Sequence, residues 1–160
     1  MNESPGTALC KACGLCCTGH LFVWTKLRSP ELDPIQSLGV QVLREPNQRG
    51  FNQPCPLWDG NCTIYETPAY PRFCETYKCK LLKEVLDEVT PFPSALEIVQ
   101  YTKSLIHELN LALPNAGNPN FRERLAQYLE QDLSDSELHR RAKELLDIYD
   151  SQFGVTDFYI

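Results

Sequence analysis

Eight cysteines, all in the first half of the chain, constrain this sequence more than any other feature. They fall in two clusters, Cys10, Cys13, Cys16 and Cys17, and then Cys55, Cys62, Cys74 and Cys79. A single cysteine often behaves as a small buried hydrophobe, but these clusters follow no apolar periodicity. We therefore predict that all eight cysteines are metal ligands.

The chain also indicates a reducing environment for these thiols. At 160 residues it can bury a core without disulfides. Residues 1–9 have neither the basic start nor the apolar run of a signal peptide. No later stretch approaches the roughly 18 apolar residues of a membrane span. We expect a soluble, cytoplasmic protein with no membrane partner, whose reduced thiols are available to a metal.

Cysteine spacing leaves the identity of the metal open. Structural zinc usually takes two Cys-x2-4-Cys pairs. One such pair is supplied by Cys10 and Cys13, or by Cys13 and Cys16. The gaps between the later cysteines are six, eleven and four residues. The triplet Cys10-x2-Cys13-x2-Cys16 also resembles the run that wraps three corners of a [4Fe-4S] cluster. An iron-sulfur cluster and zinc are therefore both candidate cofactors.

The pairing of the thiols is predicted from their order along the chain. We expect the first four cysteines to form one bank of ligands and the last four the other. Eight ligands would close two four-thiolate sites, or one site with redox-active spares. On a regular helix Cys74 and Cys79 would project about 140° apart, so either the helix begins after Cys74 or the two serve different sites. His20 is a further candidate zinc ligand, the alternative being a surface or strand-entry histidine.

The composition shift near residue 80 predicts an α+β fold. Residues 1–80 should form a small, irregular cysteine-rich module with short strands, and residues 81–160 a mostly α-helical half packed on it as one compact unit. Asp59-Gly60 is a turn signal that would bring Cys55 and Cys62 together in a hairpin. Strands are expected at 21–26 and 40–43, and one or two helical turns at 30–38. Longer helices are expected from Phe73 to Val89 and at 94–113, 121–131 and 136–149. The last of these helices has capping-box spacing between Ser134 and Glu137.

Charge and motifs exclude several classes of function. Residues 1–80 carry a net charge of +1 and residues 81–160 a net charge of −7, so we expect no nucleic-acid partner. No zinc-protease, phosphate-loop, serine-hydrolase or dinucleotide motif occurs. Three hypotheses remain. The first is a protein that holds an iron-sulfur cluster or zinc, with a redox, electron-transfer or sensing role if the metal is iron. The second is a zinc-stabilised adaptor whose helical half binds a protein partner, and the third is metal delivery through exchangeable binding.

The ordered set of eight cysteines also carries a resemblance. Cys10-Lys-Ala-Cys13-Gly-Leu-Cys16-Cys17, then Cys55-Pro-Leu-Trp-Asp-Gly-Asn-Cys62-Thr-Ile-Tyr65, then Pro71-Arg72-Phe73-Cys74 and Cys79, resemble the YkgJ-type cysteine-cluster family. That family is described as zinc- or iron-chelating and is marked by CxxCxxCC; similar domains in flagellin lysine methylases are associated with an iron-sulfur cluster. The resemblance implies metal binding through these cysteines and covers residues 10–79. Family members often carry Arg-Pro and Cys-Arg where this chain has Thr67-Pro68 and Cys74-Glu75.

Overall fold

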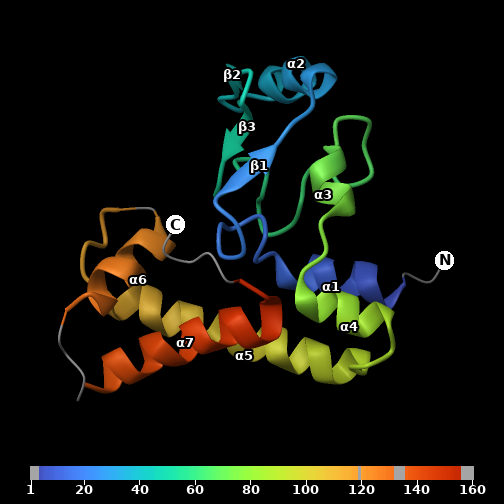
Figure 1. The fold of residues 1–160 in the computed structure, drawn as a ribbon. Helices are drawn as coiled ribbons and strands as arrows, with labels where there is room; N and C mark the ends of the chain where they lie inside the picture. The colour runs from blue at the N-terminus through green and yellow to red at the C-terminus, as the bar shows by residue number, and fades with distance from the viewer. Residues whose placement is uncertain (1–3, 119, 132–135, 156–160) are drawn as a thin grey trace. The chain divides into compact units, whose positions relative to one another are not determined.

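The computed structural model describes residues 4–118, 120–131 and 136–155 and confirms the α+β class (Figure 1). The chain divides into two compact units. The cysteine-rich unit is Gly14–Lys78, and the helical unit joins Met1–Cys13 to Cys79–Ile160. Each unit is described by itself.

A three-stranded antiparallel sheet forms part of the cysteine-rich unit. Its strands are β1 (Trp24–Lys26), β2 (Leu43–Glu45) and β3 (Gln48–Asn52), in the order β1-β3-β2. Thr25 pairs with Phe51, and Arg44 with Arg49. The strands predicted at 21–26 and 40–43 therefore form, but shorter or shifted toward the C-terminus. β2 and β3 are joined by the turn expected at Pro46, and the central strand β3 begins just after it.

Two helices and an apolar core complete this unit. They are α2 (Ser29–Ser37) and α3 (Arg72–Thr76). Fully burying one aliphatic or aromatic side chain is worth about 1.5–3 kcal/mol, so this small core is a modest source of stability. The hairpin expected around Asp59-Gly60 is reduced to one bridge, between Trp58 and Cys62, with Gly60 in the left-handed region at φ 76°. The buried core residues are Leu27, Leu32, Ile35, Val40, Phe51 and Ile64.

The helical unit is built from α1 (Pro5–Cys13), α4 (Lys80–Leu86), α5 (Phe92–Ala112), α6 (Phe121–Leu129) and α7 (Glu137–Phe153). α5 packs against α1 and α7, and α4 packs against α1, α5 and α7. The long helix expected from Phe73 is instead two helices, α3 and α4, separated by Tyr77–Cys79. Among the described residues, the four helices α4 to α7 follow residue 79. The fully buried residues of this unit include Leu81, Val99, Leu105, Leu109, Leu125, Leu145 and Tyr149.

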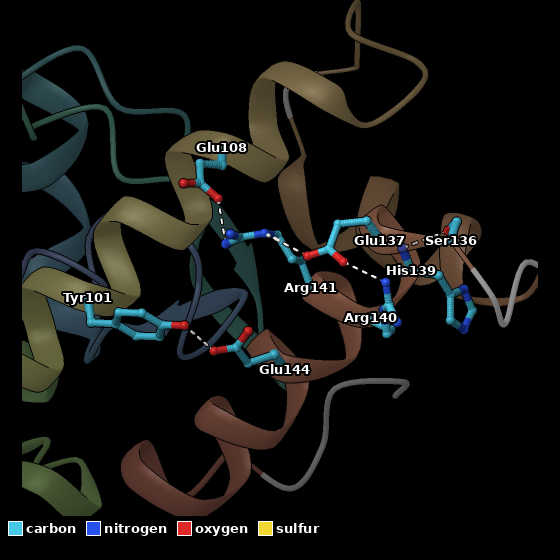
Figure 2. A network of polar contacts seen from close by, with 8 residues as sticks. All are labelled: Tyr101, Glu108, Ser136, Glu137, His139, Arg140, Arg141 and Glu144. Atoms are coloured by element: carbon cyan, nitrogen blue, oxygen red, sulfur yellow. Dashed lines mark hydrogen bonds and ion pairs between the residues drawn. The ribbon is translucent and has the colours of Figure 1, made fainter.

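Polar contacts line the seam between α5 and α7 (Figure 2). Arg141 on α7 forms an ion pair with Glu108 on α5 at 2.7 Å, and the Tyr101 hydroxyl donates to the Glu144 carboxylate. Exposed pairs of this kind are worth about 1 kcal/mol or less. Burial of side chains such as Tyr149 therefore dominates the stability of the seam.

Helix ends explain where the predicted and observed boundaries differ. The predicted capping residue Ser134 lies outside the described residues. α7 begins instead after Ser136, whose hydroxyl accepts the His139 N–H at 2.9 Å. Gly154, in the left-handed region, ends the helix. Among the described helices, none combines the length and the apolar character that crossing a membrane requires.

The two units do not follow the boundary expected near residue 80. The first helix, which carries two cysteines of the CxxCxxCC run, packs against α4 and α5 and belongs to the helical unit. The break in the chain order falls between Cys13 and Gly14, where glycine is in the left-handed region at φ 66°. The cysteine clusters are therefore divided between the two units.

Candidate metal centre

Four cysteines of the cysteine-rich unit are linked by electrostatic interactions that centre on Cys74. The charge of the Cys74 thiolate interacts with those of Cys17, Cys55 and Cys62. Cys55 also interacts directly with Cys62. We call Cys17, Cys55, Cys62 and Cys74 the four-thiol group. Its members come from three segments, namely the turn before β1, the loop after β3, and α3.

Burial and mutual repulsion both disfavour charge in this group. Burial first, and then the neighbouring thiolates and Glu31, raise the pKa of Cys74 to about 12. Burial raises the pKa of Cys55, with a smaller contribution from Cys62. A bound cation has the opposite effect on the pKa of a thiol, since a thiol that coordinates a metal is deprotonated. The four-thiol group is therefore an unfavourable place for four negative charges unless a positive metal accompanies them.

Backbone hydrogen bonds hold the segments that carry the group. The Cys55 N–H donates to the Cys17 carbonyl at 2.7 Å, which ties the first cluster to the second. Within the second, the Trp58 N–H donates to the Cys55 carbonyl at 3.2 Å. The Trp58–Cys62 bridge then brings Cys62 back toward Cys55. Local turns therefore place Cys55 and Cys62 together, as the sequence predicted, without extended strands.

Gly14 fixes the approach of the two segments. A Cβ on this residue would lie 2.4 Å from the ring of Trp58, far inside van der Waals contact. Its φ of 66° also lies in the left-handed region. The turn that carries Cys17 can therefore come close to the loop that carries Cys55 only because residue 14 has no side chain.

Aromatic rings surround the group. The Tyr70 hydroxyl donates to the Cys74 carbonyl at 3.2 Å, and its ring meets Tyr65 edge-on at 5.3 Å. Phe22 packs edge-on against Phe73 at 5.1 Å and Tyr77 at 4.8 Å. Burial, then the nearby thiolates, raise the pKa of Tyr70, so its hydroxyl stays protonated and able to donate. An apolar shell of this kind controls solvent access to a metal and tunes its potential.

Glu31 anchors α3, and sequence analysis missed it. Its carboxylate accepts the Arg72 N–H at 2.8 Å and the Arg28 N–H at 2.7 Å. It therefore ties the start of α3, two residues before Cys74, to the start of α2. Burial opposes ionisation of Glu31, but hydrogen bonds from Arg28 and Arg72 lower its pKa overall. The spacing Arg28-x-x-Glu31, typical of a helix start, was the signal available in the sequence.

A second group of thiols lies in the helical unit. Cys10 and Cys13 are three residues apart on α1 and so share one side of it. Cys79 precedes α4, where its sulfur accepts the Leu82 N–H at 3.4 Å. Partial desolvation and then the Cys79 thiolate raise the pKa of Cys10 to about 11. Cys10 and Cys79 are thus neighbours although the chain between them forms the other unit.

The two groups of thiols in the structure do not follow the order of the cysteines along the chain. We predicted banks made of the first four and the last four cysteines, whereas Cys17 lies with the later cysteines and Cys79 lies with Cys10. Cys74 lies on α3 and Cys79 directly before α4, so the continuous helix on which the two would project about 140° apart does not form. Cys16 precedes Cys17 in the same turn, and we assign it to neither group. His20 is 6% exposed, so it is not a surface residue.

The donor set fits a metal, although the thiols are not at ligand distances. Among the described residues, no three His, Cys, Asp or Glu side chains are placed to hold a single ion. All eight cysteines carry thiols rather than disulfides. Four thiols within electrostatic range are the donor type that zinc and iron-sulfur clusters select. Side-chain rotation and closure of the loops would have to accompany metal binding.

Residues 9–101 match the family model CxxCxxCC, described as "Putative zinc- or iron-chelating domain". The chain belongs to this family. The matched range includes all eight cysteines and extends beyond Cys79, through α4 and into α5, so the family covers more of the helical unit than the resemblance seen in the sequence. No curated protein and no solved structure matches the chain.

Proposed function

We propose that this protein holds a [4Fe-4S] cluster through Cys17, Cys55, Cys62 and Cys74. One observation carries the proposal: Cys17, Cys55 and Cys62, which come from two other segments of the same compact unit, all lie within electrostatic range of Cys74. Membership of a zinc- or iron-chelating family supports a metal at this place. A cluster supplies the positive charge that the four buried thiolates lack.

The order of these thiols along the chain supports a cluster over structural zinc. Structural zinc usually takes Cys-x2-4-Cys pairs, and no two of Cys17, Cys55, Cys62 and Cys74 form such a pair. The rings of Tyr65, Tyr70 and Phe73 would exclude water from such a cluster. With iron present, the chain would carry a one-electron centre suited to electron transfer or sensing.

The helical unit adds a second candidate metal site. We propose that Cys10, Cys13 and Cys79 also bind a metal, and that the eight cysteines together serve as ligands. We place the protein in the cytoplasm, where thiols stay reduced. The acidic surface of α5 to α7 is the part of the chain that would meet a protein partner.

The test is purification under strict anaerobiosis, followed by an absorption spectrum and by iron, zinc and sulfide analysis of the same sample. A brown protein that absorbs near ~400 nm and contains iron and acid-labile sulfide in equal amounts supports the cluster. A colourless protein with zinc and no sulfide overturns it. That result would also shift the function toward a zinc-stabilised adaptor, because zinc has no redox chemistry.

A further inference from the structure

The cysteine-rich unit contains a pocket of about 320 Å³ that the metal site does not use. It is lined by Arg28, Tyr70, Arg72, Glu75 and Thr76. Pockets that hold small molecules range from roughly 300 to 1,000 Å³, so this one suits a small ligand. Tyr70 links the pocket to Cys74 through its hydrogen bond to the Cys74 carbonyl.

The lining is rich in hydrogen-bond donors. Arg28 pairs with the Glu31 carboxylate through Nε at 3.2 Å and through Nη2 at 3.4 Å, and only its remaining N–H groups face a ligand. Among the described residues, the Arg72 guanidinium has no hydrogen-bond or ion-pair partner. Each guanidinium offers five N–H donors in a fixed fork that matches carboxylate and phosphate oxygens. The Thr76 hydroxyl lies on the same wall, where it is bonded to the Arg72 carbonyl at 2.9 Å.

The two arginines are held in place by one carboxylate. Glu31 accepts the backbone N–H of both Arg28 and Arg72 and is itself only 12% exposed. The two guanidinium groups therefore extend from backbone positions fixed next to each other. A preorganised pair of arginines loses less freedom on binding an anion than two independent surface arginines do.

We propose that this pocket binds a small oxyanion, the carboxylate or phosphate group of a small molecule, between the guanidinium groups of Arg28 and Arg72. Arg72 makes the main, fork-like contact. Glu75 is the only acidic residue in the lining and opposes the bound charge. This role goes beyond metal binding and does not depend on which metal the thiols hold.

Equilibrium dialysis of the full-length, anaerobically purified protein tests the proposal. Labelled inorganic phosphate and labelled succinate are used as probes, at fixed ionic strength in chloride. We expect saturable binding of at least one probe at one molecule per chain, and the probe that binds identifies the oxyanion. Arg72→Gln should weaken binding about tenfold or more, because it removes a charged fork but keeps the backbone N–H that Glu31 accepts.

Three further variants sharpen the result. Arg49→Gln removes an exposed arginine of the same unit that lies outside the pocket, and it should leave binding unchanged. Glu75→Gln should tighten binding, because it removes the opposing charge. If Arg72→Gln proves unstable, Thr76→Val replaces it as the test. This variant leaves both arginines intact and should weaken binding. Absence of saturable binding of both probes, equal losses in Arg72→Gln and Arg49→Gln, or weaker binding in Glu75→Gln would overturn the proposal.

Discussion

The backbone of Cys55 is bonded to the backbone of Cys17, with 2.7 Å between the donating nitrogen and the accepting oxygen. This bond joins the last cysteine of the CxxCxxCC run to the first cysteine of the second cluster. The same two residues share electrostatic interactions with Cys74. The hydrogen bond therefore holds together two of the segments that carry the four-thiol group.

Removing the metal should unfold the cysteine-rich unit and spare the helical unit. Metal binding contributes roughly 10–16 kcal/mol in zinc-finger peptides, as much as the whole stability of many domains. Both tryptophans, Trp24 and Trp58, lie in the cysteine-rich unit, so their fluorescence reports on it alone. We expect anaerobic metal removal to shift the fluorescence to the red while most helical circular dichroism remains. Unchanged fluorescence in fully metal-free protein would contradict this expectation.

Gly14→Ala should destabilise the cysteine-rich unit by about 2–5 kcal/mol, the sum of left-handed strain and a clash in packed surroundings. The clash is with the ring of Trp58. Gly39→Ala is the matched control, because Gly39 also has a positive φ, 93°, but nothing lies within 4 Å of its added Cβ. We expect the control to lose only the strain energy. Denaturant unfolding followed by tryptophan fluorescence measures both, and equal losses would show that the Trp58 contact is unimportant.

Arg124→Met should cost the helical unit about 2–5 kcal/mol. Arg124 is 4% exposed, and its guanidinium donates to the carbonyls of Asn110, Leu113 and Pro114 at 2.9–3.1 Å. Its loss removes the donors from three partly or fully buried carbonyls at and just beyond the end of α5. Arg140→Met, which removes an exposed ion pair, should cost less than about 1 kcal/mol. Thermal unfolding of the helices measures both losses, and comparable losses would argue against the carbonyl contacts.

Glu31 should make stability depend on pH in the acid range. Its pKa in the folded protein is lowered from the ordinary value of 4.5, because the hydrogen bonds from Arg28 and Arg72 outweigh its burial. Its contribution is therefore fully present above about pH 4.5 and is lost as the pH falls through the lowered value. The difference in unfolding free energy between wild type and Glu31→Gln should shrink as the pH falls across that range. A difference that stays constant would refute the role of Glu31.

The sequence predicted regular elements better than it predicted the site. The apolar stripes of α5, α6 and α7 placed these helices to within a few residues, because packing one face of a helix imposes a period on the sequence. The four-thiol group depends on irregular turns and on side-chain contacts such as that of Gly14 with Trp58, which impose no period. Chain order therefore placed Cys17 and Cys79 in other groups than those that the structure shows. Cys74 and Cys79 lie on different elements because the helix is interrupted between them.

Metal analysis of two serine variants tests the central claim most directly. Cys74→Ser removes a member of the four-thiol group. Cys79→Ser is its control, because serine is a good helix N-cap and should keep the bond to the Leu82 N–H. After anaerobic purification, Cys74→Ser should lose the iron and sulfide held by the four-thiol group. Cys79→Ser should keep that iron and sulfide and lose only the metal of the second site. Equal cluster content in Cys74→Ser and wild type would contradict the account.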